Sequence, residues 1–317
     1  MDMVDILSKT SDFKLIEGEI KKNTLSNAIL LISKDSIYSF EFALALSQLL
    51  FYGTMQKDDN FLKIHSGGHP DLKIYPLKDK LLVADSEEIV SECYAAPVLA
   101  DKKVIIIKDF DNSMEQAQNK LLKILEEPPA NVFLILTCSN ANLVLPTIRS
   151  RCNKYELKKV ESRVVETYLQ GRPNAQLIAS LCDGYLGRAD SLSKLSYLPE
   201  LFDNVIALLT KMTSSKQVLT FSKNILPYKD HFDLIIEILS FALEDLLLLK
   251  AGRASEVRLQ TAREALQSVS DSYSIKAICE LQPLLNKAVK EQLYNTNFTL
   301  IIENLLLNIL EVKFICK

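Results

Sequence analysis

The stretch from Lys120 to Cys152 constrains the fold of this 317-residue chain most strongly. A segment rich in Leu and Glu, typical of a helix, stops at Pro128-Pro129, because proline cannot continue a helix and disfavours helical backbone in the residue before it. The apolar run from Val132 to Thr137 follows without alternation, as expected for a strand buried on both faces. A polar turn and two closely spaced arginines end the stretch. The pattern predicts part of an α/β domain.

Strand-like and helix-like segments alternate through the first half of the chain. Apolar runs predict further strands over Ala28 to Ile32 and Lys103 to Ile107, and Asp71 to Pro76 is expected to form another strand. Helical patterns separate these runs at Phe40 to Phe51, Ser86 to Tyr94 and Ser113 to Glu127. Strands that alternate with helices favour a parallel sheet with helices on both faces.

The strand signals disappear after about residue 160. The chain then predicts a small helical unit, followed by long helices such as Phe232 to Lys250, Ile275 to Leu293 and Phe298 to Val312. We therefore expect an α/β domain over residues 1–160, a helical lid over 161–200 and an all-α domain over 201–317.

Composition limits the possible functions. The net charge of −3 argues against a basic DNA-binding module, so any DNA contact would be local or made by partners. None of the six cysteines forms a C-x-x-C pair and the three histidines do not cluster with them, so no zinc site is expected. Such scattered cysteines are typical of reduced thiols in the cytoplasm. Neither a signal peptide nor a membrane span is predicted.

The segment after the first predicted strand departs from a nucleotide-binding P-loop. A P-loop, G-x-x-x-x-G-K-[ST], uses glycines to bring N–H groups to phosphates, lysine to neutralise charge and a hydroxyl to hold Mg²⁺. In the register set by the preceding strand, these positions are held by Ser33, Ser36, Tyr38, Ser39 and Phe40. We expect no phosphate cradle here, with Tyr38 filling space that phosphates would need. The alternative is that the loop was never a P-loop.

The second metal position of such an ATPase is changed as well. After an apolar strand, this chemistry needs an Asp for Mg²⁺ and then an acid that activates water. Here Lys108 stands at the Mg²⁺ position and Asp109 at the position of the second acid. Because two separate elements have lost their ligands, a degenerate ATPase fits better than a loop that never bound nucleotide. We expect no cofactor and no bound metal.

Arg151 is the residue that still suits phosphate chemistry. Its planar, permanently charged guanidinium is the right group to stabilise charge on a transferring phosphoryl group. Such an arginine can act in trans, on nucleotide held by a neighbouring subunit. The alternative is a surface arginine that pairs with a carboxylate, which is common for an isolated arginine.

These segments together resemble the AAA+ clamp-loader family of bacterial DNA polymerase III, whose delta-prime subunit the chain resembles most, followed by gamma/tau. The segments that carry the resemblance are Gly68 to Leu72, Ala117 to Pro129, Pro146 to Cys152, Gly184 to Ala189 and Asn295 to Leu300. The resemblance implies an AAA+ domain, a lid and a helical collar that joins neighbouring subunits. It also implies that Arg151 is an arginine finger in trans, and that Thr137 and Arg188 occupy the two nucleotide-sensing positions. Without a phosphate cradle, Thr137 and Arg188 could persist as structural residues, with Arg188 paired to a nearby acid.

The chain also departs from the family pattern. Many members carry a four-cysteine zinc module after the first helix, but Phe51 to Leu62 contains no cysteine. We therefore expect a delta-prime-like subunit without zinc or ATP, which helps to load the sliding clamp on primed DNA within a hetero-oligomer. Its expected partners are gamma/tau and delta, and indirectly the clamp and primer-template DNA. The alternatives are an active gamma/tau-like ATPase with an unorthodox P-loop and a non-replicative AAA+ scaffold.

Overall fold

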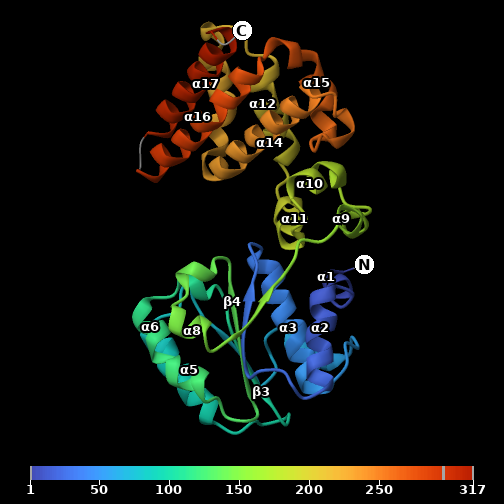
Figure 1. Cartoon of the computed structure of the whole chain (residues 1–317), viewed down its shortest axis with the longest axis vertical. Helices are drawn as coiled ribbons and strands as arrows, with labels where there is room; N and C mark the ends of the chain where they lie inside the picture. The colour runs from blue at the N-terminus through green and yellow to red at the C-terminus, as the bar shows by residue number, and fades with distance from the viewer. Residues whose placement is uncertain (1, 295–296, 316–317) are drawn as a thin grey trace. The chain divides into compact units, whose positions relative to one another are not determined.

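The computed structural model describes residues 2–294 and 297–315 (Figure 1). The chain packs as two compact units. The first comprises the residues up to Tyr168 together with Gly184–Arg188, and the second comprises Leu169–Asp183 with the chain from Ala189 onward. The predicted three-part division at residues 160 and 200 stays a prediction.

A five-stranded parallel sheet forms the centre of the first unit, as predicted. Its strands follow the spatial order β2-β3-β4-β1-β5. They are β1 (Ala28–Ile32), β2 (Leu72–Tyr75), β3 (Lys103–Ile107), β4 (Val132–Cys138) and β5 (Asn153–Glu156). Every residue of β3 and β4 is buried, which explains why these strands appear in the sequence as uninterrupted apolar runs.

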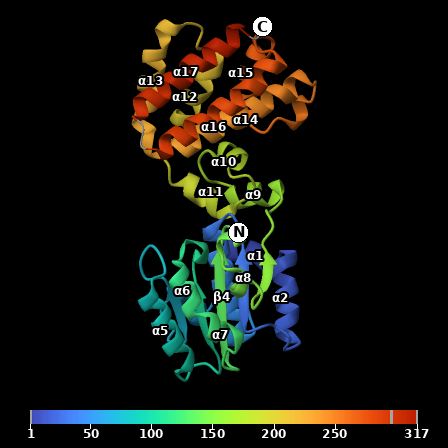
Figure 2. The same ribbon diagram turned by 60° about the vertical axis from the view of Figure 1, so that its left-hand side comes forward.

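Helices cover both faces of this sheet. Those of the first unit are α1 (Met3–Leu7), α2 (Ser11–Lys21), α3 (Ser36–Tyr52), α4 (Asp59–His65), α5 (Val83–Tyr94), α6 (Glu115–Lys120), α7 (Leu122–Glu126), α8 (Pro146–Arg149) and α9 (Ser162–Leu169). Figures 1 and 2 show α2 on one side of the sheet and α5 and α6 on the other. Two layers of helices around a parallel sheet therefore bury both of its faces, as the sequence predicted.

Two local features differ from the sequence prediction. The helix expected over Ser113 to Glu127 is divided into α6 and α7 at Leu121, whose N–H donates to Gln118 O three residues back at 3.1 Å. Strand β5 was not predicted, because its four residues are all exposed or only partly buried and carry no apolar run. This strand joins the sheet through backbone pairing with β1.

The loop after Pro128-Pro129 is fixed to the start of β1. The Asn27 side chain donates from Nδ2 to Val132 O at 2.7 Å and to Ala130 O at 3.1 Å. The segment that opens β4 is thereby joined to the strand beside it, and the end of α7 is placed next to the sheet.

The second unit is entirely helical in its described residues. Its helices are α10 (Ala175–Leu181), α11 (Leu186–Ser193, which begins in the first unit), α12 (Leu198–Thr210), α13 (Val218–Ile225), α14 (Phe232–Lys250), α15 (Arg263–Val269), α16 (Ile275–Leu293) and α17 (Phe298–Ile315). The helices predicted from the apolar spacing are confirmed, and any differences concern only the residues at which they begin or end. Asn295 and Thr296, the first two residues of the Asn295 to Leu300 segment that carries part of the resemblance, lie outside the described residues.

No helix in the described part of the chain combines the length and the apolar character needed to cross a lipid bilayer.

Candidate functional site

The connection between β1 and α3 is short. Only three residues, Ser33 to Asp35, separate the strand from the helix. Asp35 is the N-cap of α3, so the positions expected for the last P-loop glycine, Tyr38, and for the lysine, Ser39, already lie in its first turn. The Ser39 N–H donates to Asp35 O at 3.0 Å, and its hydroxyl donates to Ser36 O at 3.0 Å. These polar groups are therefore used inside the helix.

The Asp35 carboxylate gathers N–H donors from two helices. Oδ1 accepts from the Tyr38 N–H at 3.0 Å, while Oδ2 accepts from the Gly187 N–H at 2.7 Å and from the Arg188 N–H at 3.4 Å. Asp35 is only 6% exposed. An anion at the start of a helix is stabilised by free N–H groups and by the helix dipole. The chain thus places its own carboxylate beside the degenerate phosphate loop.

Tyr38 is buried against the start of α2. Its hydroxyl hydrogen-bonds the Thr10 side chain, and burial, followed by the charges of Asp12 and Asp35, raises the pKa of the phenol. Tyr38 therefore stays protonated across the physiological range. The ring contributes to the core between α2 and α3, and the anion beside the loop is that of Asp35.

Phe40 and Lys108 contact each other at the two positions that hold Mg²⁺ in a P-loop ATPase. Lys108 Nζ lies 4.9 Å from the centroid of the Phe40 ring, within the range of a cation–π contact. Phe40 stands at the hydroxyl position of the loop and Lys108 at the aspartate position after β3. The two positions that would jointly hold a metal ion in a P-loop ATPase therefore form a contact with each other.

Asp109 and Thr137 are linked at the ends of β3 and β4. The Asp109 backbone is left-handed, with φ of 47°, and its N–H donates to Thr137 Oγ1 at 3.1 Å. Burial raises the pKa of the Asp109 carboxyl most strongly, and the negative charge of Asp111 raises it further. The positive charge of Lys108 lowers the same pKa, but by less. The Thr137 hydroxyl oxygen thus accepts a hydrogen bond from the backbone of the same chain. A sensing role for Thr137 or Arg188 stays a prediction.

Asp111 was not singled out by the sequence reasoning. Its Oδ2 accepts from the Ser139 hydroxyl at 2.6 Å, the Ser139 N–H at 3.1 Å and the Asn140 N–H at 2.9 Å. These bonds join the turn after β3 to the turn after β4, so the carboxyl ends of two central strands are fixed together. Within residues 2–294 and 297–315, no three His, Cys, Asp or Glu side chains gather in a way that would hold a metal ion.

Arg151 follows α8 and contacts both α8 itself and the end of α7. One terminal nitrogen donates to Thr147 O at 2.9 Å, and the other donates to Glu126 Oε2 at 3.2 Å. The side chains of Arg151 and Glu126 are 32% and 58% exposed, and ion pairs this exposed contribute only about 0–1 kcal/mol. The pairing expected of a surface arginine is therefore present, but it is weak.

Cys152, next to Arg151, is buried, as are Cys93 and Cys138. Burial raises the pKa of each of these thiols to about 12. They are therefore protonated at neutral pH and act as apolar core groups. The groups of the Pro146 to Cys152 motif that can act on a charged ligand are consequently its two arginines, Arg149 and Arg151.

Comparison with known proteins relates this arrangement to one group of replication proteins. The sequence profile of the family described as "DNA polymerase III, delta subunit" matches residues 8–161. The DNA polymerase III subunit delta' of Bacillus subtilis (strain 168) is 26% identical over 306 residues, which cover 88% of this chain and 91% of that protein. The sequence of this chain is therefore similar to those of DNA polymerase III clamp-loader subunits.

Two further proteins are similar to this chain, one in sequence and one in fold. The DNA polymerase III subunit tau of Salmonella typhimurium is 30% identical over 145 residues, which cover 43% of this chain but only 23% of tau. In fold, the chain resembles the gamma subunit-related protein of Thermotoga maritima, with a TM-score of 0.52 at 20% identity, covering 95% of this chain and 99% of that one. The predicted AAA+ fold is confirmed.

The profile match includes the β1–α3 connection, Lys108 and Arg151, but not Gly187 or Arg188. The sequence analysis likewise missed Asp35 and its contact with Gly187. An aspartate just before a helix is the sequence signal of an N-cap. That signal marks Asp35, but it does not reveal a second set of donors more than 150 residues away.

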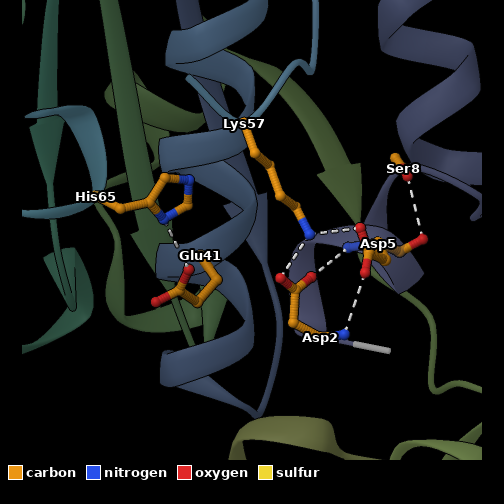
Figure 3. Close-up of polar contacts among 6 residues, drawn as sticks. All are labelled: Asp2, Asp5, Ser8, Glu41, Lys57 and His65. Atoms are coloured by element: carbon orange, nitrogen blue, oxygen red, sulfur yellow. Dashed lines mark hydrogen bonds and ion pairs between the residues drawn. The ribbon is translucent and has the colours of Figure 1, made fainter. Parts of the chain in front are cut away.

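A separate cluster of charged side chains contacts the N-terminal helix α1. Figure 3 shows Lys57 between Asp2 and Asp5, with Nζ 2.6 Å from one oxygen of each. The hydrogen bond from Lys57 lowers the pKa of the Asp5 carboxyl most strongly. Nearby, His65 Nδ1 lies 3.3 Å from Glu41 Oε2. Lys57 belongs to the segment after α3, so these contacts fasten α1 to that segment.

Proposed function

We propose that this clamp-loader subunit of DNA polymerase III holds no nucleotide and helps to load the sliding clamp on primed DNA as a delta-prime-type component. The observation that carries the proposal is the Asp35 carboxylate beside the short β1–α3 connection, accepting N–H groups from both helices. A second anion, such as a nucleotide phosphate, would be repelled from this place. The Lys108–Phe40 contact adds a positive charge at the position where Mg²⁺ would bind. The subunit alone is accordingly no ATPase.

Arg151 serves the nucleotide of a neighbouring subunit in this proposal. Its guanidinium is partly exposed, and its pair with Glu126 is weak enough to open when an adjacent subunit presents phosphate. The hydrogen bond to Thr147 O keeps the side chain close to α8. Arginine fingers act in this way in other P-loop NTPase systems, by stabilising charge that develops in the transition state.

The proposed partners are the gamma/tau and delta subunits in a cytoplasmic hetero-oligomer, with the clamp and primer-template DNA contacted at least indirectly. The final helix α17 supports such contacts, because Leu300 and Leu307 on it are 53% and 44% exposed although its other face is buried. Large exposed apolar side chains gathered on one helix are a feature of interaction surfaces.

The absence of nucleotide is tested on the isolated chain. A ligand present at 100 times its Kd stabilises a protein by about 2.7 kcal/mol, which raises the melting temperature. We expect millimolar ATP with Mg²⁺ to leave the melting temperature unchanged, because Asp35 and Lys108 occupy the phosphate and metal positions. Gamma/tau from the same cell is the positive control. A saturable rise in the melting temperature of this chain would instead support the active-ATPase alternative.

Assembly is tested by reconstitution with gamma/tau and delta from the same cell. We expect the three proteins to elute together from a sizing column, and clamp loading on primed DNA to require this chain. If the other subunits assembled and loaded clamps equally well without it, the non-replicative scaffold alternative would replace this proposal.

A further inference from the structure

Asp35 makes contacts that an ordinary helix cap does not need. The N-cap of α3 requires only the bond from the Tyr38 N–H to Oδ1. Oδ2 is turned to the Gly187 and Arg188 N–H groups, which lie 152 and 153 residues further along the chain. The carboxylate therefore joins the first turn of α3 to the first turn of α11.

Gly187 shows how closely these two segments approach. A Cβ added to Gly187 would lie 2.2 Å from Asp35 Oδ1 and 2.5 Å from the Ile37 Cβ. Real Cβ atoms essentially never come so near to other heavy atoms, so only glycine fits against the carboxylate. The peptide of Gly187 thus meets Asp35 directly, without space for an intervening ligand.

A second glycine, Gly184, lies at the other end of the segment that contains Gly187. Gly184 has a φ of +79°, and a Cβ there would lie 2.9 Å from Val160 O. The Val160 N–H donates to Gly184 O at 3.0 Å. The segment from Gly184 to Arg188 is therefore held at one end by the backbone near Val160 and at the other by the Asp35 carboxylate. Immediately after Arg188 the chain enters the second unit.

We propose that Asp35 is a built-in anion that latches the segment Gly184–Arg188 onto the start of α3, in the manner of a bound phosphate but permanently. Bonds from N–H groups to a carboxylate are stronger than bonds between neutral groups, and burial shields them from water. The exit of the chain from its first unit is consequently fixed without any ligand. This inference concerns the chain alone and does not depend on Arg151 acting on a neighbour.

The latch is tested by hydrogen exchange of the full chain, followed on peptides that contain Gly187 and Arg188. We expect Asp35→Ala to raise the exchange rate of these amides at least tenfold, because their acceptor is removed. Formate, which has the size of the missing carboxylate, should restore most of the protection in Asp35→Ala and leave the wild type unchanged. Asp35→Asn keeps an acceptor oxygen but loses the charge, so its amides should exchange at an intermediate rate.

Asp58→Ala is the matched control. Asp58 caps α4 through the N–H groups of Asn60 and Phe61, which lie in its own helix, so its loss should leave the Gly187 peptide protected. Peptides covering β3 and β4 report whether each variant is folded.

The latch is refuted if a folded Asp35→Ala protein protects Gly187 and Arg188 as the wild type does. Increased exchange that formate does not reverse would also contradict it, because an anion would then not be what holds the segment. If Asp35→Ala does not fold, equal protection in Asp35→Asn and the wild type would overturn the role of the charge.

Discussion

Replacing Arg151 with alanine is expected to slow ATP hydrolysis by about 1,000-fold or more at the nucleotide site that this subunit faces in the assembled clamp loader. Arginine fingers supplied in trans contribute about 10³–10⁵ to kcat in P-loop NTPases. Freeing Arg151 from Glu126 costs only about 0–1 kcal/mol, because both side chains are substantially exposed. The measurement is single-turnover hydrolysis in complexes stimulated by clamp and DNA.

Three further variants separate catalysis from structure at this position. Arg149→Ala removes the neighbouring arginine of the same motif, and hydrolysis should stay within about twofold of the wild type if only a finger contributes strongly. Arg151→Lys keeps the charge but loses the planar fork, so it should recover little of the rate. Glu126→Ala removes the internal partner and should leave the rate unchanged or slightly higher. Normal hydrolysis by the assembled Arg151→Ala complex would eliminate the finger.

Replacing Gly187 with alanine is expected to lower the free energy of unfolding of the first unit by about 1–3 kcal/mol, the usual cost of overpacking a well-packed site. The new Cβ would meet the Asp35 carboxylate and the Cβ of Ile37, neither of which is the free end of a long flexible chain. Either the start of α3 or the segment around Gly187 must therefore move. Chemical denaturation, followed by a probe within the sheet, measures the change.

Gly18→Ala provides the opposite expectation from the same chemical change. Gly18 lies inside α2, and nothing stands within 4 Å of a Cβ added there. Alanine costs less backbone entropy in a helix than glycine, so this variant should be neutral or more stable by about 0.5–1 kcal/mol. If Gly187→Ala were as stable as Gly18→Ala, the close approach at Asp35 would not be a structural requirement.

The buried strands could be predicted because burial leaves a signal within a few residues. Strands β1 and β3 are continuous apolar runs, and the structure places their ends at the predicted residues. Strand β5 carries no such signal, because Asn153 to Glu156 is held by backbone pairing at the edge of the sheet. The break at Leu121 was also invisible, since Leu, Lys and Glu favour helix on both sides of it.

Candidate site residues could be predicted only where a known sequence motif gives the residue type required at each position. Departures from the P-loop pattern could be named because each position has a required chemistry, from which Lys108 departs directly. That the loop holds no phosphate stays a prediction. The compensating contacts were not recognised. Lys108 against Phe40 and Asp35 against Gly187 each join segments distant in the sequence, and a single sequence contains no information on such proximity. Tyr38, expected to fill the phosphate space, instead contributes to the core beside Thr10.

In the proposed function, this subunit contacts nucleotide only through Arg151, and that nucleotide is bound by a neighbouring subunit. Photo-crosslinking with an ATP analogue that carries an aryl azide on its γ-phosphate tests it most directly. We predict that, in the assembled complex, the label on this chain falls between Pro146 and Cys152, and that the isolated chain is not labelled. Labelling of Ser33 to Phe40 in the isolated chain, competed by ATP, would contradict the account, because the nucleotide would then be held by this subunit itself.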